Sequence, residues 1–381
     1  RDLVRSRGLG DVYKRQITII IAVHEHEHNN IYYIIFEIKC QAEEFMAITS
    51  KEIAELAGVS RGTVDRALKG REGVNPKTKE RILKIAEENN YKPNLIGKAL
   101  VYSNRSVPVA VIMNSIGNSF FDDVKKGMLA AEREYSDYGI KLNIKEIKGY
   151  NACDIIQAVS DLPEDTKNVI LTPVEDDALC KKIDEMTDSG INVITLSSDI
   201  SDSKRLTYVG CDYLKSGETA GRLVGLLSGG KANLCIVTGS LAHKGHKQRV
   251  EGVSNVIKEY KNIQIADVIE NNDDNEKAYT AMKIVLGKNK NIDFVCITAG
   301  GVTGTLKAIK ESERNIKVCS FDDTETTRKA MLNGDILATV YQQPFEQGYN
   351  AVKSVFETVV AKTAVPEYQY SQLYIKVDKS L

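Results

Sequence analysis

From Ser106 onward, short apolar runs of strand length alternate with longer stretches that have helical periodicity. Two series of apolar runs predict strands, the first at Pro108–Met113, Leu142–Ile147, Val169–Leu171 and Val193–Leu196, and the second, beginning near Ser216, at Leu234–Val237, Gln264–Val268, Phe294–Thr298 and Lys317–Phe321. Strands that alternate with helices favour parallel sheets joined by right-handed crossovers. The predicted fold class of this region is therefore α/β, with two doubly wound parallel-sheet lobes.

Polar and aromatic residues gather directly after several of these predicted strands. Among them are Asn118, Phe120, Phe121, Ser198, Asp322 and Gln342. In doubly wound sheets a ligand binds at the carboxyl ends of the strands, here in the cleft between the two lobes. Carboxylates accept hydrogen bonds from neighbouring hydroxyls, amides both donate and accept, and aromatic faces cover the C–H side of a sugar ring. The mixture favours a hydroxyl-rich, uncharged ligand.

Before this region, the stretch TSKEIAELAGVSRGTVDRALKG predicts two short helices around an Ala-Gly-Val turn. Thr49 or Ser50 can cap the first helix, Gly58 ends it, and Ser60 can cap the second. The residues that the second helix leaves outward are Arg61, Gly62, Asp65 and Arg66. Pro76 begins a third helix at its first-turn position. This is the pattern of an all-α helix-turn-helix, whose second helix enters the major groove of DNA.

The charge of the chain is unevenly distributed. Residues 46–105 hold twelve Lys and Arg against seven Asp and Glu, whereas the whole chain has a formal net charge of -1. A basic N-terminal module on a mildly acidic body favours contact with nucleic acid at one end only. The seven cysteines are scattered singly without a C-x-x-C spacing, which argues against disulfides or a zinc site and favours a reducing cytoplasm.

Residues 1–45 continue neither pattern. Their apolar runs, Ile17–Val23 and Ile31–Phe36, are too short for a transmembrane helix, and the segment lacks the features of a signal peptide. The alternating His and Glu from His24 to His28 could bind a metal, but no scaffold pattern supports them. We therefore exclude this segment from the fold as a non-native or disordered extension, and we expect no metal site and no membrane segment.

The headpiece, residues 46–92, resembles that of the lactose-repressor (LacI/GalR) family over about fifty residues. The resemblance rests on Ala-Gly-Val-Ser, Thr-Val, Arg-Ala-Leu, Val-Asn-Pro and Asn-Tyr-Lys-Pro-Asn. It implies that Arg61, Gly62 and Arg66 read base edges, and that further DNA contacts lie at Thr49, Ser60, Thr63, Asn75, Asn94 and Leu100. Asp65 departs from the family, which commonly has a small hydroxyl residue near the phosphates at this position.

The segment after Pro93 matches the family's hinge, which becomes helical on operator DNA. Leu100 falls at the position of the leucine that inserts into a minor-groove base step, paired with its copy from a second subunit. The alternative is that Leu100 packs on the core domain. The resemblance therefore implies a homodimer that binds an operator with an inverted repeat.

The stretches NSFFDDVKKGMLAAERE, VITLSSD, KQRVEGV, CSFDDTE and YQQPFEQG resemble type I periplasmic sugar-binding proteins, notably ribose-binding ones. The resemblance implies ring stacking on Phe120 and Phe121, a charged hydrogen bond from Arg249 or Lys247, paired hydroxyls on Asp322, and a contact from Gln342 at a crossing strand. Ser197-Ser198 and Thr298–Gly301 depart from the ribose binders, so ribose itself is doubtful as the ligand. The purely structural alternatives are that Phe120 is core, that Arg249 pairs with Glu251, and that Asp322 caps a turn.

The expected domains are an extension at 1–45, a headpiece at 46–92, a hinge and linker at 93–105, and a sensor at 106–381. The sensor's first lobe covers about 106–210 and 342–365, and the second covers about 211–341 and the C-terminus.

We predict a cytoplasmic DNA-binding regulator with a sugar or cyclitol effector and no cofactor. One rival is a solute-binding protein of a sugar transporter. The other is an enzyme, which is disfavoured because no G-x-S-x-G, Walker or H-E-x-x-H motif occurs.

Overall fold

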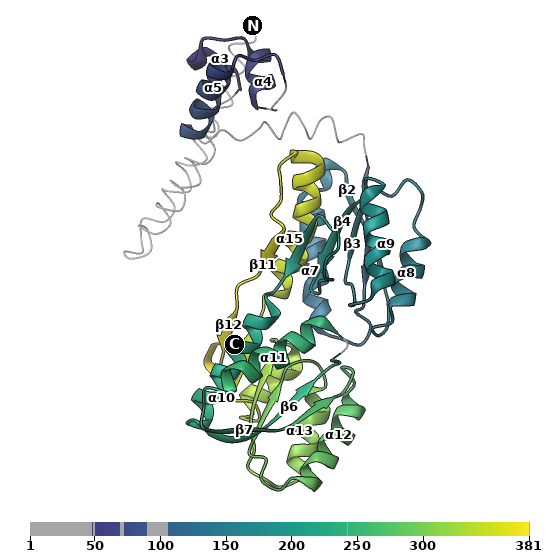
Figure 1. The fold of residues 1–381 in the computed structure, drawn as a ribbon, viewed down its shortest axis with the longest axis vertical. Coiled ribbons are helices and arrows are strands. Elements are labelled where there is room, and N and C mark those ends of the chain that lie inside the picture. Colours follow the sequence, from purple (N-terminus) through teal and green to yellow (C-terminus); the bar gives the residue numbers. More distant parts are fainter. Residues whose placement is uncertain (1–47, 49, 69–71, 90–105, 242, 381) are drawn as a thin grey trace, which may run out of the picture. The chain divides into compact units, whose positions relative to one another are not determined.

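A computed structural model describes residues 48, 50–68, 72–89, 106–241 and 243–380, which form two compact units divided near residue 95 (Figure 1). The predictions for residues 1–45, for the hinge segment, and for Thr49, Asn94 and Leu100 lie outside these described residues. Within the same ranges, no helix combines the length and the apolar character needed to cross a membrane. The domain boundaries inferred from the sequence stay predictions.

The N-terminal unit is a bundle of three helices, α3 (Ser50–Ala57), α4 (Arg61–Leu68) and α5 (Pro76–Glu88). Its core is formed by side chains at helical spacing, namely Ile53, Ala54, Ala57, Val64, Ala67, Ile82 and Ala86. Gly58 ends α3 with a φ of 60°, a conformation that glycine adopts without strain. The Asn75 side chain accepts a hydrogen bond from the Lys77 amide and so caps α5. The three predicted helices are therefore present.

The C-terminal unit contains two six-stranded sheets, which are mainly blue to teal and mainly green in Figure 1, each with a yellow strand from the C-terminal part of the chain. The first has the order β11-β5-β4-β3-β1-β2, and its strands are β1 (Val107–Met113), β2 (Ile140–Glu146), β3 (Asn168–Leu171), β4 (Asn192–Leu196), β5 (Thr207–Gly210) and β11 (Tyr368–Tyr370). The second has the order β12-β10-β9-β8-β6-β7, and its strands are β6 (Lys231–Thr238), β7 (Asn262–Glu270), β8 (Phe294–Ile297), β9 (Lys317–Phe321), β10 (Ala338–Tyr341) and β12 (Tyr374–Lys376). All described pairings are parallel except β10 with β12, so the α/β class predicted from the sequence is confirmed.

Helices cover both faces of each sheet. Those of the first lobe are α7 (Phe120–Glu134), α8 (Ala152–Ser160), α9 (Asp177–Asp188) and α15 (Pro344–Phe356), and those of the second are α10 (Tyr213–Ser228), α11 (Lys244–Ile257), α12 (Asn275–Lys288), α13 (Val302–Glu311) and α14 (Glu325–Leu332). Each sheet is buried between two apolar clusters, one on either face. Short 3-10 and π turns complete the described chain at Ser136–Tyr138, Glu357–Ala361 and Asp378–Ser380.

The chain passes between the lobes three times. Residues 211–212 lead from β5 to α10, residues 342–343 lead from β10 back to α15, and residues 371–373 lead from β11 to β12. Strand β11 therefore joins the first sheet a few residues beyond the expected boundary at 365. Because every crossing begins at the carboxyl end of a strand, the cleft between the lobes is lined by the loops that follow the strands.

Helices α7 and α15 pack so closely that glycine is required where they meet. A Cβ atom built on Gly348 would lie 2.0 Å from the Val124 carbonyl oxygen, and one on Gly127 would lie 1.9 Å from the Phe345 carbonyl oxygen. Backbone atoms cannot move aside as a flexible side chain can. The contact is reciprocal, with each helix offering one glycine to the other.

We expect Gly348→Val to destabilise the protein by about 2 to 3 kcal/mol, because the added side chain must push the two helices apart. Gly287→Ala is the matched control, since nothing lies within 4 Å of its Cβ position on α12. That change should stabilise the protein by about 0.5 kcal/mol through the lower entropy of the unfolded chain. Urea unfolding measures both effects, and equal stabilities of the two variants would contradict the tight packing.

Candidate functional site

A cavity of about 120 Å³ lies in the cleft, at the carboxyl ends of strands from both sheets. Six of the seven ligand-binding residues predicted from the sequence line it, namely Asn118, Phe120, Phe121, Arg249, Asp322 and Gln342. Ser198 does not, although its neighbour Ser197 does. The Ser198 side chain is 1% exposed, and its hydroxyl has no hydrogen-bond partner among the described residues. The carboxyl ends of the strands thus bring most of the candidates to one place.

The backbone that follows the strands is held in unusual conformations around the cavity. Ser197, Asp322 and Asp273 all have positive φ angles, of 56°, 65° and 56°. Non-glycine residues rarely adopt this region, and they do so mainly where the surrounding structure imposes it. These turns re-aim the side chains at the ends of β4, β7 and β9.

Aromatic rings form one wall of the cavity. Phe120 and Phe121, at the start of α7, lie edge to face with their ring centroids 5.2 Å apart. Both are also members of the apolar core of the first lobe. Their predicted role in ring stacking and the structural alternative are therefore compatible, because the same side chains pack against the core and face the cavity.

Arg249, on α11, is a buried cation whose donors are incompletely used. Its guanidinium lies 4.7 Å from the ring centroid of Tyr213 and 4.2 Å from that of Phe321. Nη1 donates to the Thr298 carbonyl oxygen at 2.8 Å, but Nε and Nη2 have no partner in the part of the chain that the structure describes. Unsatisfied buried donors are costly, so this edge of the guanidinium is suited to a ligand acceptor. Lys247, the alternative candidate, is exposed and does not line the cavity.

Asp322 faces the cavity from the end of β9. Its carboxylate accepts a hydrogen bond from Gln342 Nε2 at 2.8 Å, and the Gln342 backbone oxygen accepts one from Gln347 Nε2, also at 2.8 Å. Burial raises the pKa of Asp322, while the nearby Arg249 opposes the rise. The carboxylate keeps acceptor capacity toward the cavity, which suits adjacent hydroxyl groups.

Several cavity residues were missed by the sequence analysis. Tyr150, from the loop after β2, donates a hydrogen bond to the carboxylate of Asp273, from the loop after β7, and so joins the two lobes. The other Asp273 oxygen accepts from the Gly300 amide at 2.7 Å. Both Tyr150 and Asp273 follow strands within a few residues, so the rule that found Asp322 could have found them. His243 and His246, at the start of α11, follow the end of β6 at Thr238, so the same rule could also have pointed to them.

The two histidines pack against each other, with ring centroids 4.4 Å apart, and against Tyr150. Nδ1 of His246 accepts a hydrogen bond from the Ser240 amide at 3.1 Å, which leaves Nε2 to carry the proton of the neutral ring. Burial, with a further contribution from Arg249, lowers the pKa of His246 to about 3. Burial also lowers the pKa of His243 well below its usual value.

These pKa values predict a pH-dependent stability. Between pH 6.5 and about 3, His246 takes up a proton in the unfolded chain but not in the folded protein. The free energy of unfolding should therefore fall with decreasing pH, by about 1.4 kcal/mol per pH unit for this residue. His246→Asn keeps an acceptor near the position of Nδ1 and should make that slope shallower by about this amount. Urea unfolding between about pH 4 and 6 measures the difference, and an unchanged slope would contradict a neutral His246.

The DNA-reading candidates lie on the N-terminal unit. Arg61, Gly62 and Arg66 are exposed on α4, and a Cβ atom on Gly62 would meet only the Ser60 Oγ, at 3.8 Å. Arg61 Nε donates to Ser50 Oγ at 3.2 Å, and the Ser60 and Thr63 hydroxyls are 2.9 Å apart. Arg66 makes no hydrogen bond or ion pair with another described residue. The outer face of α4 is therefore open to a partner.

Two capping residues in this unit were also predicted to contact DNA. Ser60 Oγ accepts from the Thr63 amide at 3.2 Å, and Asn75 Oδ1 accepts from the Lys77 amide at 3.0 Å. Each side chain thus has a local role in starting a helix. Their DNA contacts stay predictions.

Comparison with known proteins agrees with this arrangement of two units. The model of "Bacterial regulatory proteins, lacI family" matches residues 49–94, and the model of "Periplasmic binding protein domain" matches residues 109–363. The probable HTH-type transcriptional repressor ExuR of Bacillus subtilis (strain 168) is 29% identical over 72% of this chain and 82% of its own length. The ribose import binding protein RbsB of Escherichia coli (strain K12) is 22% identical over 68% and 87%.

Among solved structures, the glucose-galactose binding protein GanP of Geobacillus stearothermophilus is similar with a TM-score of 0.67 and 27% identity. The match covers 73% of this chain and 99% of GanP. A helix-turn-helix unit followed by a two-lobed binding domain defines a DNA-binding transcriptional regulator. The chain belongs to the lacI family of bacterial regulatory proteins, with a periplasmic binding protein domain as its C-terminal unit.

Proposed function

We propose that this regulator is a repressor whose operator affinity is set by one monosaccharide or cyclitol bound in the cleft cavity. The convergence of Arg249, Asp322 and the two phenylalanines on one cavity carries the proposal. A volume of about 120 Å³ holds roughly ten water-sized groups, close to the ten to twelve non-hydrogen atoms of a pentose or hexose.

Each predicted ligand contact has a chemical role in the proposal. Arg249 Nε and Nη2 donate to ring or hydroxyl oxygens, and Asp322 accepts from two adjacent hydroxyls. Phe120 and Phe121 cover the C–H face of the ring. The amides of Asn118 and Gln342 complete the polar contacts, and the unpartnered hydroxyl of Ser198, next to the cavity residue Ser197, is kept as a candidate.

On the DNA side, Arg61 and Arg66 donate bidentate hydrogen bonds to guanine O6 and N7, while Gly62 allows close approach. Ser60, Thr63 and Asn75 are proposed to position the unit on the duplex. Thr49, Asn94 and Leu100, which lie outside the described residues, are proposed to contact DNA on the basis of the family resemblance. A homodimer would place two such units on an inverted repeat in the cytoplasm.

The coupling between the sites is proposed to work through lobe closure. A ligand held by residues of both lobes stabilises the closed arrangement, and a change of lobe angle alters the geometry of the two DNA-reading units of a dimer. The effector and the operator must then change each other's affinity by the same factor.

The names of the relatives favour this function over the two rivals. One relative is named a transcriptional repressor, and others are named binding proteins for ribose or for glucose and galactose. The transport proteins support a sugar ligand, whereas the match at residues 49–94 favours a regulator over a solute carrier. None of these three names is that of an enzyme.

The test is a thermal-shift screen of the full chain against neutral pentoses, hexoses and cyclitols, followed by operator titrations with any hit. A ligand at a hundred times its dissociation constant adds about 2.7 kcal/mol to native stability. We expect one class of monosaccharide or cyclitol to raise the melting temperature and to change operator affinity. Stabilisation only by phosphorylated or acidic sugars would contradict a neutral effector, and a hit without any effect on DNA binding would contradict the coupling.

A further inference from the structure

A second cavity, of about 200 Å³, lies beside two of the three segments that connect the lobes. The first lobe contributes Asp199, Tyr208, Tyr368 and Tyr370 to its lining, and the second lobe contributes Lys244 and Gln248 from α11. The crossing residues Cys211 and Asp212 complete it together with Tyr213 and Gly245. The shape of this hinge cavity therefore depends on the angle between the lobes. None of its lining residues was among the predicted ligand contacts.

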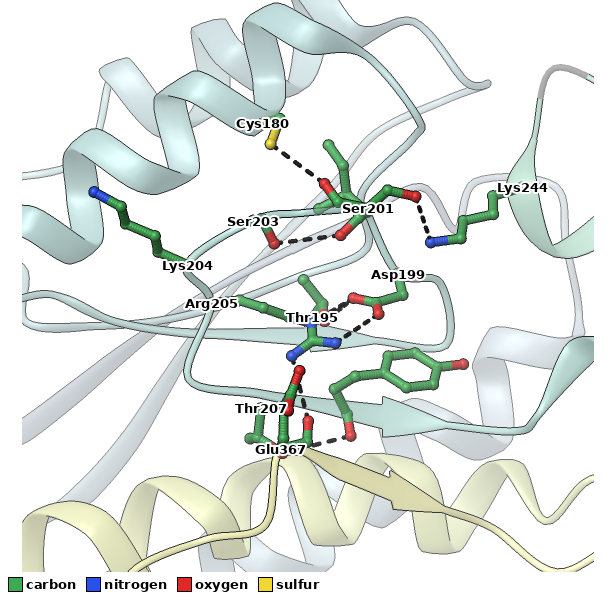
Figure 2. Close-up of polar contacts among 12 residues, drawn as sticks. Cys180, Thr195, Asp199, Ser201, Ser203, Lys204, Arg205, Thr207, Lys244 and Glu367 are labelled. Carbon is green, nitrogen blue, oxygen red and sulfur yellow. Dashed lines mark hydrogen bonds and ion pairs between the residues drawn. The ribbon is translucent and has the colours of Figure 1, made fainter.

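The polar groups on the first-lobe side are hydrogen-bonded to one another (Figure 2). The Arg205 guanidinium donates to both oxygens of Asp199, at 2.5 and 2.7 Å, and also to the Glu367 carbonyl oxygen at 3.3 Å. Thr195 Oγ1 donates to Asp199 at 2.8 Å. Because Asp199 is paired in this way, its charge is neutralised within the protein.

On the second-lobe side, Lys244 reaches across to the first lobe (Figure 2). Its ammonium donates to Ser201 Oγ at 2.8 Å and lies 3.8 Å from Glu175. Asp212, the other charged lining residue, accepts from the Lys215 amide through Oδ1. Asp199 and Lys244 are thus engaged within the protein, and Asp212 is the carboxylate left to accept hydrogen bonds from the hydroxyl groups of a ligand.

Aromatic faces supply the rest of the lining. Tyr368 and Tyr370 are stacked with centroids 5.6 Å apart, and Tyr208 meets Tyr370 edge-on at 6.0 Å. The Tyr370 side chain is 53% exposed, so one of its faces is available. The side-chain amide of Gln248 forms no hydrogen bond with any other residue in the described ranges. This group can both donate and accept hydrogen bonds.

We propose that the hinge cavity is a second ligand site, which binds a neutral polyhydroxylated ring, a monosaccharide or cyclitol. The ring stacks on Tyr370, Gln248 exchanges hydrogen bonds with its hydroxyls, and the Asp212 carboxylate accepts from them. By the measure used for the first cavity, the volume corresponds to about seventeen water-sized groups, enough for one monosaccharide.

Tyr213 connects this site to the effector cavity. Its ring lines both cavities, lies 4.7 Å from the Arg249 guanidinium and packs against His243, and its hydroxyl donates to the Ser197 carbonyl oxygen. A ligand that fits the hinge cavity in this lobe arrangement stabilises the arrangement in which Tyr150 and Asp273 close the cleft. The two ligands should therefore strengthen each other's binding by one common factor.

The absence of tryptophan from the chain allows a reporter at this site alone. Tyr368→Trp places a fluorophore on the rim of the hinge cavity and keeps a ring against Arg205, whose guanidinium lies 4.7 Å from the Tyr368 centroid. The full-length reporter protein is titrated with D-ribose, D-glucose, D-galactose and myo-inositol. It is then titrated again with Asp322→Ala, with Gln248→Leu, or with the control Glu251→Ala on the exposed face of α11.

We expect a saturable fluorescence change with at least one of the four probes. The fluorescence change should persist in the Asp322→Ala and Glu251→Ala variants. In the Gln248→Leu variant, half-saturation should require at least a tenfold higher concentration of the probe. Three results would overturn the site: no saturable change with any probe, a change that disappears with Asp322→Ala, or a change that survives Gln248→Leu undiminished. The effector site is judged by its Asp322-dependent thermal shift, so failure of either proposal is seen separately.

Discussion

Asp322→Ala is expected to weaken effector binding by about 100-fold or more. Hydrogen bonds to a charged group contribute about 1.5 to 3 kcal/mol each, and the carboxylate is placed to accept from two neighbouring hydroxyls. A tenfold change in affinity corresponds to about 1.4 kcal/mol, so losing both bonds gives at least two decades. The substitution also removes the acceptor of the Gln342 amide and the charge that faces Arg249. Isothermal titration with the sugar identified by thermal shift measures the loss.

Asp323→Asn provides a control of the same chemistry at the adjacent position. Asp323 points away from the cavity lining and is paired with Arg328, at 2.7 Å, and with Lys376. Its substitution should lower the stability of the second lobe and leave effector affinity within about threefold of wild type. Operator binding without effector should be normal in both variants. Equal losses of effector affinity at 322 and 323 would show that the carboxylate acts on folding instead of on the ligand.

Much of this site was accessible from the sequence because one topological rule applies. Once apolar runs alternate with helices, the residues after each strand must lie at the cleft, and this rule alone selected Phe120, Phe121, Asp322 and Gln342. All four residues line the cavity, and their contacts with a ligand stay predictions. Arg249 lies on a helix, and only the resemblance to sugar-binding proteins placed it in the site.

The cavity residues that the sequence analysis missed reach the cavity through tertiary packing. Tyr150 and Asp273 belong to different lobes, and their contact depends on lobe closure, which no local pattern encodes. His243 and His246 reach the cavity because α11 begins there, and their burial comes from tertiary packing. Ser198 stays a prediction, because the cavity is lined by its neighbour Ser197, whose positive φ turns the backbone at the end of β4. Side-chain direction after a strand depends on such angles.

In the N-terminal unit the helices followed from local signals, since apolar spacing, Gly58 and Pro76 each act within a turn of the chain. Local signals do not show which exposed side chains of α4 already have a partner within the protein. Arg61 is held by Ser50, whereas Arg66 makes no hydrogen bond or ion pair within the described ranges. The two arginines are chemically alike in the sequence but differ in what binding DNA would require of them, because Arg61 must release a neighbour first.

Arg66→Ala should therefore have the largest effect on operator recognition. A bidentate arginine–guanine pair contributes about 1 to 3 kcal/mol of discrimination, and a dimer uses the residue twice, so the specific affinity should fall at least about 30-fold. The full-length protein is first used to select its operator from random duplexes. Fluorescence anisotropy then compares that operator with a scrambled duplex of equal length at several salt concentrations.

Lys84→Ala is the charge-matched control, because Lys84 is exposed on α5, paired only weakly with Glu88 at 3.8 Å. It should lower affinity for both duplexes modestly and alike, as expected for a lost long-range attraction to phosphate. Arg66→Ala should instead lower the ratio of operator to scrambled binding, with its effector-induced thermal shift intact. If Arg66→Ala weakens both duplexes equally and makes the salt dependence shallower, Arg66 contacts phosphate, and base reading must be assigned to Arg61.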